Sequence, residues 1–219
     1  MRTVVNSLLV AGVLFFCGCA NFSTLQTAET MQKDKFELGV GATFTGYQAK
    51  LETTTTDPNT GAEVTTTETE SFTVPAVTVS GRYGLSDRFE LHGVIWLPFG
   101  ASAGGKYMLV GEPGENGFKF SPGLDISVPI TISVNDDSST LIDLYVPLHM
   151  GYRASDSFEV YWTPKYVMRF FGGDFGHAPG GTVGVALGKD TTFMVEGSAL
   201  YDTLSEKPIF NVGLGVAFK

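Results

Sequence analysis

Large apolar side chains alternate with small or polar ones along most of this chain. In the last segment, residues 209–218, one face carries only large apolar residues: Phe210, Val212, Leu214, Val216 and Phe218. The opposite face carries only small or polar residues: Asn211, Gly213, Gly215 and Ala217. A period of two residues is that of a β-strand whose two faces meet different environments. Because the pattern recurs from Lys35 onwards, the sequence predicts an all-β domain over residues 35–219.

The alternating segments predict about ten strands joined in chain order by turns. They are residues 35–45, 71–85, 88–97, 102–110, 118–130, 141–153, 158–171, 182–188, 192–201 and 209–218. This order favours an antiparallel up-and-down sheet, and closure into a barrel would remove both exposed edges. The Thr- and Glu-rich residues 50–70 are predicted to form a long polar outer loop, with a turn or a hairpin extension above the domain.

Charged residues are nearly absent from the apolar face and gather on the other face. We expect ten of them to line the interior of a barrel as ion pairs, because unpaired buried charge is costly. They are Arg82, Arg88, Glu90, Lys106, Lys119, Asp125, Asp143, Lys165, Arg169 and Glu196. Alternation alone does not say which face points outwards, since a soluble barrel has the same period.

Aromatic residues indicate the outward face. Nine of them fall at nearly the same depth on the apolar face: Phe36, Tyr83, Phe89, Tyr107, Phe118, Tyr152, Phe158, Phe193 and Phe218. A ring of aromatic side chains at one level is typical of the membrane–water interface. The pattern therefore favours a closed transmembrane β-barrel. Some of the five prolines within the predicted strands should mark bulges or strand ends, because each removes a ladder donor. They are Pro75, Pro122, Pro129, Pro147 and Pro164.

Composition agrees with this class. The 219 residues are 43% hydrophobic and only 17% charged, and the net charge of −9 argues against a nucleic-acid partner. Cys17 and Cys19 both lie in the N-terminal leader, so the remainder holds no intrachain disulfide.

Residues 1–18 have the layout of a secretory signal, with Arg2 followed by an apolar core. The Phe16–Cys19 stretch resembles a bacterial lipobox, which implies acylation of Cys19; ordinary cleavage without a lipid is the alternative. Ala20 after this cysteine implies, by the same resemblance, export to the outer membrane. Residues 19–34 are polar and lack periodicity, so we expect a periplasmic tether.

With this leader, the chain resembles a small bacterial outer-membrane β-barrel protein. The resemblance implies a location in the outer membrane with periplasmic termini, and contact with membrane lipid. Phe218 resembles the terminal aromatic signal read by the barrel-assembly machinery, although Lys219 follows it here.

The predicted function is structural, or a narrow channel for small solutes, without cofactor or catalysis. One rival is a rim enzyme acting on lipid, for which His177 beside Asp174 in an outer loop is the best candidate pair. His92 and His149 are expected to be polar filling of the lumen. The other rival is a lipid-tethered, soluble, lipocalin-like binder. No G-x-S-x-G, H-E-x-x-H or phosphate-loop motif is present.

Overall fold

A computed structural model of the chain describes residues 23–56, 63–97, 100–129 and 141–219. The predicted leader and Cys19 lie outside these residues. No helix in the described ranges is long and apolar enough to cross a membrane.

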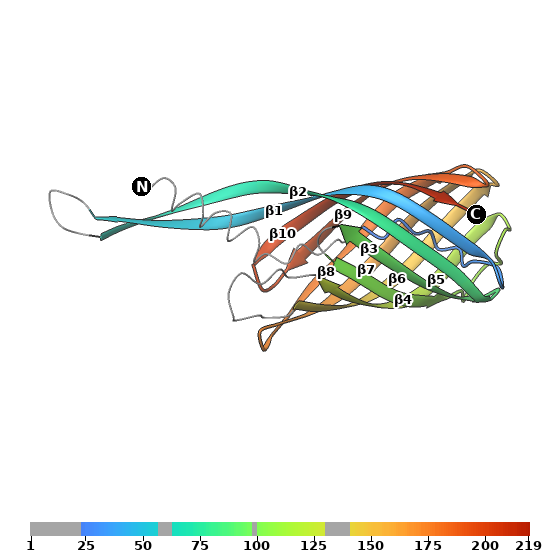
Figure 1. The fold of residues 1–219 in the computed structure, drawn as a ribbon, viewed down its shortest axis with the longest axis horizontal. Coiled ribbons are helices and arrows are strands. Elements are labelled where there is room, and N and C mark those ends of the chain that lie inside the picture. Colours follow the sequence, from blue (N-terminus) through green and yellow to red (C-terminus); the bar gives the residue numbers. More distant parts are fainter. Residues whose placement is uncertain (1–22, 57–62, 98–99, 130–140) are drawn as a thin grey trace.

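The described residues form one closed antiparallel barrel of ten strands (Figure 1). Consecutive strands pair as neighbours, and β1 pairs with β10 to close the ring. The strands are β1 (Phe36–Thr56), β2 (Glu63–Ser86), β3 (Phe89–Leu97), β4 (Gly100–Tyr107), β5 (Gly117–Pro129), β6 (Leu141–Ser155), β7 (Phe158–Phe171), β8 (Asp174–Leu187), β9 (Thr191–Asp202) and β10 (Lys207–Phe218). The predicted up-and-down barrel is confirmed.

The two ends of the barrel differ, and we name them by what they carry. The turn end holds Phe36, Phe218 and the turns at residues 87–88, 156–157 and 188–190. The hairpin end is the one from which β1 and β2 project as a long two-stranded ribbon (Figure 1).

The barrel exterior is apolar. Phe36, Tyr83, Phe118 and Tyr152 are among its large exposed side chains. The register places these aromatics at one level of the turn end, since Phe36 pairs with Tyr83 and Phe118 with Tyr152. Leu124, Ile126 and Val128 continue the exposed apolar face of β5 away from this ring. The ten-residue span from Phe118 to Val128 rises roughly 25 Å along a tilted strand, which matches the hydrocarbon thickness that a barrel must cover.

This sidedness contradicts the soluble, lipocalin-like alternative. Such a barrel would bury its apolar face and expose its charges, whereas here the charged face points inwards. The physical reason is that large apolar side chains outside are stable only against lipid.

Two predicted loops are strands. Residues 50–56 and 63–70 of the polar stretch continue β1 and β2, which pair without interruption from Phe36–Tyr83 to Thr56–Glu63. Of the two forms expected, this is the hairpin extension. The expected outer loop around His177 is the first half of β8, joined to β7 by a turn at Gly172 and Gly173 with φ of 59° and 97°. Glycine adopts the positive φ values that this two-residue turn requires, so β8 runs back along β7 directly after it.

Four of the five prolines, Pro164 included, lie at gaps in a ladder or at a strand end, as expected, whereas Pro75 pairs with Phe44 inside the unbroken β1–β2 ladder. Pairing between β5 and β6 skips from Pro122 to Asp125, and pairing between β6 and β7 skips from Pro147 to Met150. Pro129 ends β5, and Pro75 lies in the ribbon just beyond the last β2–β3 pair, where only β1 is a neighbour.

Candidate functional site

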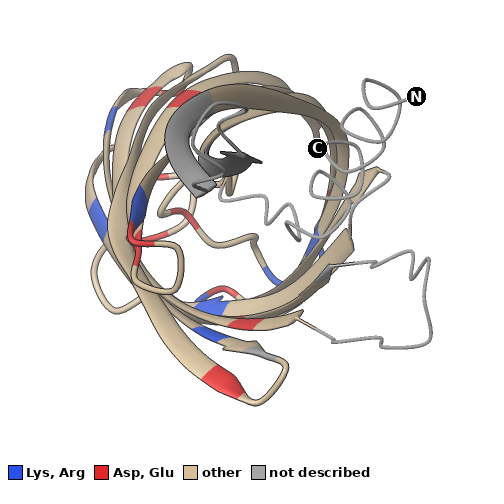
Figure 2. Ribbon diagram, turned by 90° about the vertical axis from the view of Figure 1, so that its left-hand side faces the viewer, with Lys and Arg blue, Asp and Glu red and all other residues tan. Residues whose placement is uncertain are grey.

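The lumen of the barrel is occupied by the chain's own N-terminal segment. Residues 23–34, which we call the plug, run through the interior towards the turn end and join β1 at Phe36; Figure 2 shows a coil crossing inside the ring of strands. Most plug side chains are buried. The sequence predicted a free tether here. A polar, aperiodic segment is stable inside this barrel because the interior wall is itself polar and supplies its hydrogen bonds.

Glu196 on β9 anchors the start of the plug. Its carboxylate accepts hydrogen bonds from the main-chain N of Thr24 at 2.8 Å and of Leu25 at 3.0 Å. The hydroxyls of Ser23 and Tyr161 donate to the same carboxylate. Four donors on one buried carboxylate satisfy its lone pairs, so Glu196 fixes the plug at this depth.

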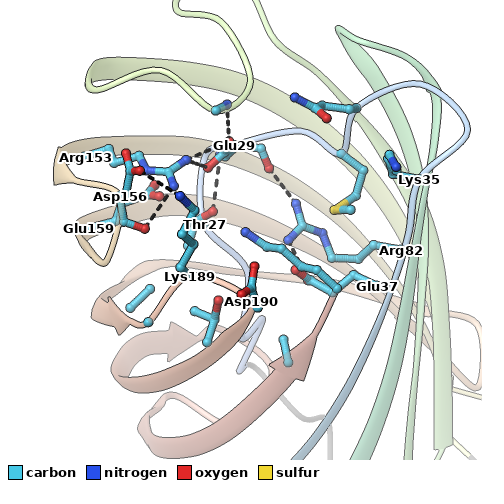
Figure 3. A pocket seen from close by; sticks show the side chains of 18 of the residues that line it. Thr27, Glu29, Lys35, Glu37, Arg82, Arg153, Asp156, Glu159, Lys189 and Asp190 are labelled. Atoms are coloured by element: carbon cyan, nitrogen blue, oxygen red, sulfur yellow. Dashed lines mark hydrogen bonds and ion pairs between the residues drawn. The ribbon is translucent and has the colours of Figure 1, made fainter.

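Glu29 anchors the middle of the plug (Figure 3). Arg153 Nη1 donates to both carboxylate oxygens at 3.0 and 2.9 Å, Lys119 Nζ lies 3.2 Å from Oε2, and the main-chain N of Gly114 donates to Oε1. Burial alone would raise the pKa of Glu29, but Lys119, the Gly114 amide and Arg153 hold this pKa below its usual value. The carboxylate is therefore ionised at neutral pH and ties the plug to β5 and β6.

The plug main chain is also bound by charged groups of the wall. Lys106 Nζ donates to the carbonyl of Thr27 at 2.7 Å, and the main-chain N of Met31 donates to Glu90 at 2.8 Å. Arg82 bridges Glu90 and Glu37 and also donates to the carbonyl of Glu29. These wall charges thus satisfy both one another and the backbone of the plug.

Leu25 is the apolar contact of the plug. It forms a buried cluster with Tyr161, Ala186, Met194 and Ala217. Inward-facing glycines make the room: a Cβ on Gly41 or Gly215 would lie 2.6 or 2.9 Å from Leu25 Cδ1. The small inward-facing residues of β1 and β10 therefore leave the space that Leu25 of the plug occupies.

The hairpin-end half of the lumen is filled by wall side chains. Arg169 donates to Asp143 at 3.0 Å and to Asp202 at 3.2 Å. Beside this triad lies a buried cluster made of Tyr145, Val167, Ala178, Leu200 and Ile209. Buried groups thus occupy both halves of the interior.

The structure buries eight of the ten predicted lumen residues inside the barrel: Arg82, Glu90, Lys106, Lys119, Asp143, Lys165, Arg169 and Glu196. Asp125 is also interior, with a side chain 14% exposed, and it contacts His92 Nε2 at 2.7 Å. Arg88 is a correction: it lies in the β2–β3 turn, 42% exposed, and pairs with Glu112. A turn residue no longer follows strand parity, which explains the error.

The histidines divide between the two faces. His92 and His149 are buried in the lumen, and His149 contacts Thr163 at 3.3 Å. His177 faces outwards from β8 and stacks on Tyr166, with ring centroids 5.8 Å apart. Asp174 lies three residues earlier on the same strand and so belongs to the opposite face. The structure therefore does not bring the candidate pair His177 and Asp174 together. Among the described residues no group of three or more His, Cys, Asp or Glu side chains could hold a metal ion.

Sequence reasoning missed the plug residue Glu29 and its contacts with Arg153 and Gly114. The alternation does put Arg153 on the charged, inward face of its strand. No local signal links it to Glu29, because 124 residues separate them. Asp202, the second partner of Arg169, lay one residue beyond the predicted strand.

A closed ring with an apolar exterior and a charged, occupied interior defines the class: a transmembrane β-barrel with an internal plug. No protein-family model matches the sequence, and no curated protein matches it.

Solved structures of small barrels resemble the chain weakly. The attachment invasion locus protein Ail of Yersinia pestis, in complex with the heparin analogue sucrose octasulfate, is 8% identical with a TM-score of 0.35; the match covers 86% of this chain and 99% of Ail. The outer membrane protein OprG of Pseudomonas aeruginosa is 12% identical with a TM-score of 0.25, over 88% of this chain and 99% of OprG. Similarities this low carry no information on the function of this chain.

Proposed function

We propose that the protein is an integral outer-membrane β-barrel that its own N-terminal segment closes to solutes, and that its role is structural. The observation that carries this proposal is the occupied lumen. The plug fills the turn-end half, and the Arg169 triad with its apolar cluster fills the other half. A ten-stranded barrel has a narrow interior, so one chain segment and the wall side chains are enough to block it.

The proposed orientation places the turn end at the periplasm. Both ends of the strand series, Phe36 and Phe218, meet there, as a terminal aromatic assembly signal would require. The aromatic ring at this end then lies at the periplasmic interface. Membrane lipid and the barrel-assembly machinery are the partners that this proposal implies.

The ribbon of β1 and β2 would then project from the cell. Pairing of β1 with β10 ends at Gly46, and pairing of β2 with β3 ends at Val77, whereas the two strands stay paired to each other as far as Thr56 and Glu63. A barrel that conducts nothing acts through such exposed parts.

A narrow channel is the second candidate function. The observation in its favour is that the plug is held mainly by hydrogen bonds and ion pairs around Glu196 and Glu29. Water can replace such contacts, so displacement of the plug would widen the turn-end half. A rim enzyme has no comparable support, because His177 stacks on Tyr166 and lies on the opposite face from Asp174.

Single-channel current from purified, folded protein in a planar bilayer tests the proposal. The expected result is no conductance from protein whose insertion is verified by protection from protease. Steady ohmic steps that change on reversal of charge, in Arg169→Glu or Asp125→Lys, would refute closure and establish a passage.

A further inference from the structure

The turn end holds a pocket that the closed barrel does not require. Its volume is about 330 Å³, and it lies between the plug, the start of β1 and the turns that follow β6 and β8 (Figure 3). Asp156 and Lys189 at its rim are well exposed, so the pocket opens to solvent at this end. A volume near 300 Å³ is at the lower limit of small-molecule sites.

Glu159 on β7 is the unusual group in the wall of this pocket. Its side chain is only 6% exposed, and its Oε1 has no hydrogen-bond partner among the described residues. The cations nearby are bound elsewhere: Arg153 and Lys119 to Glu29, and Lys106 to Glu90 and the Thr27 carbonyl. A buried carboxylate without a partner is destabilising unless something outside the chain pairs with it.

The rest of the lining defines the shape of that partner. Most of the lining is polar or charged, and Met31, Ala186, Met194 and Ala217 form its buried apolar part. This part suits a short aliphatic body. Glu29, Glu37 and Asp156 are paired with cations of the chain, so Glu159 is the buried carboxylate left for a ligand. It matches an ammonium group, which has three donors and a charge of the right sign. A divalent cation would instead take about six oxygen ligands.

We propose that this pocket binds a small aliphatic primary amine in its ammonium form, with Glu159 as the acceptor of the ammonium group. The inference rests on the docked plug of the proposed function, because the plug residues Thr27, Glu29, Thr30, Met31 and Gln32 line the pocket. Glu159 is kept unpaired in the free protein, at a cost in stability, and the ligand supplies the missing charge.

Isothermal titration of the full-length protein in detergent micelles tests the inference, with pentan-1-amine as the probe and 1-pentanol as its neutral counterpart. Saturable binding is expected for the amine and not for the alcohol. Glu159→Gln keeps the shape of the side chain and should weaken binding by at least about tenfold, the loss of one buried charge contact. Glu159→Asp keeps the charge and should bind within a few-fold of wild type. Glu112→Gln removes an exposed carboxylate outside the pocket and should change nothing.

Thermal unfolding separates the proposed site from a merely structural carboxylate. Without ligand, Glu159→Gln should unfold at a higher temperature than wild type, because the unpaired charge is gone. The amine should raise the unfolding temperature of wild type and leave that of Glu159→Gln unchanged. Equal binding by wild type and Glu159→Gln, or no saturable binding of the amine at millimolar concentration, would overturn the proposal.

Discussion

Removal of the Glu29 carboxylate should release the plug while the barrel stays folded. In Glu29→Ala, Lys119 loses its ion-pair partner, yet its side chain is only 1% exposed and its Nζ has no hydrogen bond in the described part of the chain. Arg153 suffers less, because the carbonyls of Ser155 and Asp156 still accept from it at 3.3 and 3.1 Å. Breaking a buried ion pair on one side costs about 3–5 kcal/mol.

This free-energy cost lowers the stability of the docked plug relative to the undocked plug. At roughly 1.4 kcal/mol for each factor of ten, the population of the open plug should rise by about two to three orders of magnitude. Hydrogen exchange measures it directly, because the amides of Leu25 and Met31 donate to Glu196 and Glu90 only while the plug is docked. Both amides should exchange faster by that factor in Glu29→Ala, while amides in the middle of β6 and β9 should keep their wild-type rates.

A matched control and a second-site variant sharpen the test. Glu112→Gln breaks the exposed Glu112–Arg88 pair, whose contribution should be at most about 1 kcal/mol. The double variant Glu29→Ala/Lys119→Met removes the stranded charge and should recover part of the lost protection. Unchanged exchange at Leu25 and Met31 in Glu29→Ala would refute the reasoning, as would equal acceleration throughout the barrel.

Three further predictions concern pH, packing and lipid. The pKa of Glu29 is lower in the folded than in the unfolded protein. The stability that Glu29 gives to the docked plug is therefore complete above the pKa of an unfolded Glu, about 4.3, and is lost as pH falls through the lower folded value. Hydrogen exchange of the plug amides, corrected for its intrinsic rate, should stay constant from neutral pH to about pH 5 and rise only below about pH 4. Gly213→Val places a side chain against Ser23 and Leu25, so the plug should become accessible to protease while gel mobility still shows a folded barrel. A plug that stays protected would contradict the packing of Leu25 against the small residues of β10. Leu124→Arg puts a charge on the exterior of β5 and should cost about 2–4 kcal/mol in urea unfolding from vesicles, whereas no loss would contradict a lipid-facing position.

The barrel was predictable because its signal is local and repeated. Phe118 lies at the start of one predicted strand and Tyr152 near the end of the next. Parity and the positions of the turns already placed the two residues at one level. Burial of Lys119 and Asp143 followed from the same parity. Periodicity therefore predicts the strands and the residues that share a face, and the ring of aromatic residues predicts which face points outwards.

The plug was not predictable from periodicity, because an extended coil has none. Its anchors depend on pairs such as Glu29 with Arg153 and Leu25 with Glu196, which are 124 and 171 residues apart in the chain. One signal was nevertheless present: the small inward face at Gly213 and Gly215 leaves a space that some segment must fill. Loss of parity outside strands explains the error at Arg88.

An engineered disulfide between the plug and the wall tests the central claim, that residues 23–34 lie inside the barrel. A Cβ on Gly151 would lie 3.2 Å from the Cβ of Ala28, a few tenths of an ångström short of the usual disulfide spacing of about 3.5–4.5 Å. The Ala28→Cys/Gly151→Cys variant, with Cys17 and Cys19 replaced by Ser, should form an intramolecular bond in the folded protein, detected by mass spectrometry of linked peptides. Two free thiols that both react readily with a maleimide in folded protein would contradict the account.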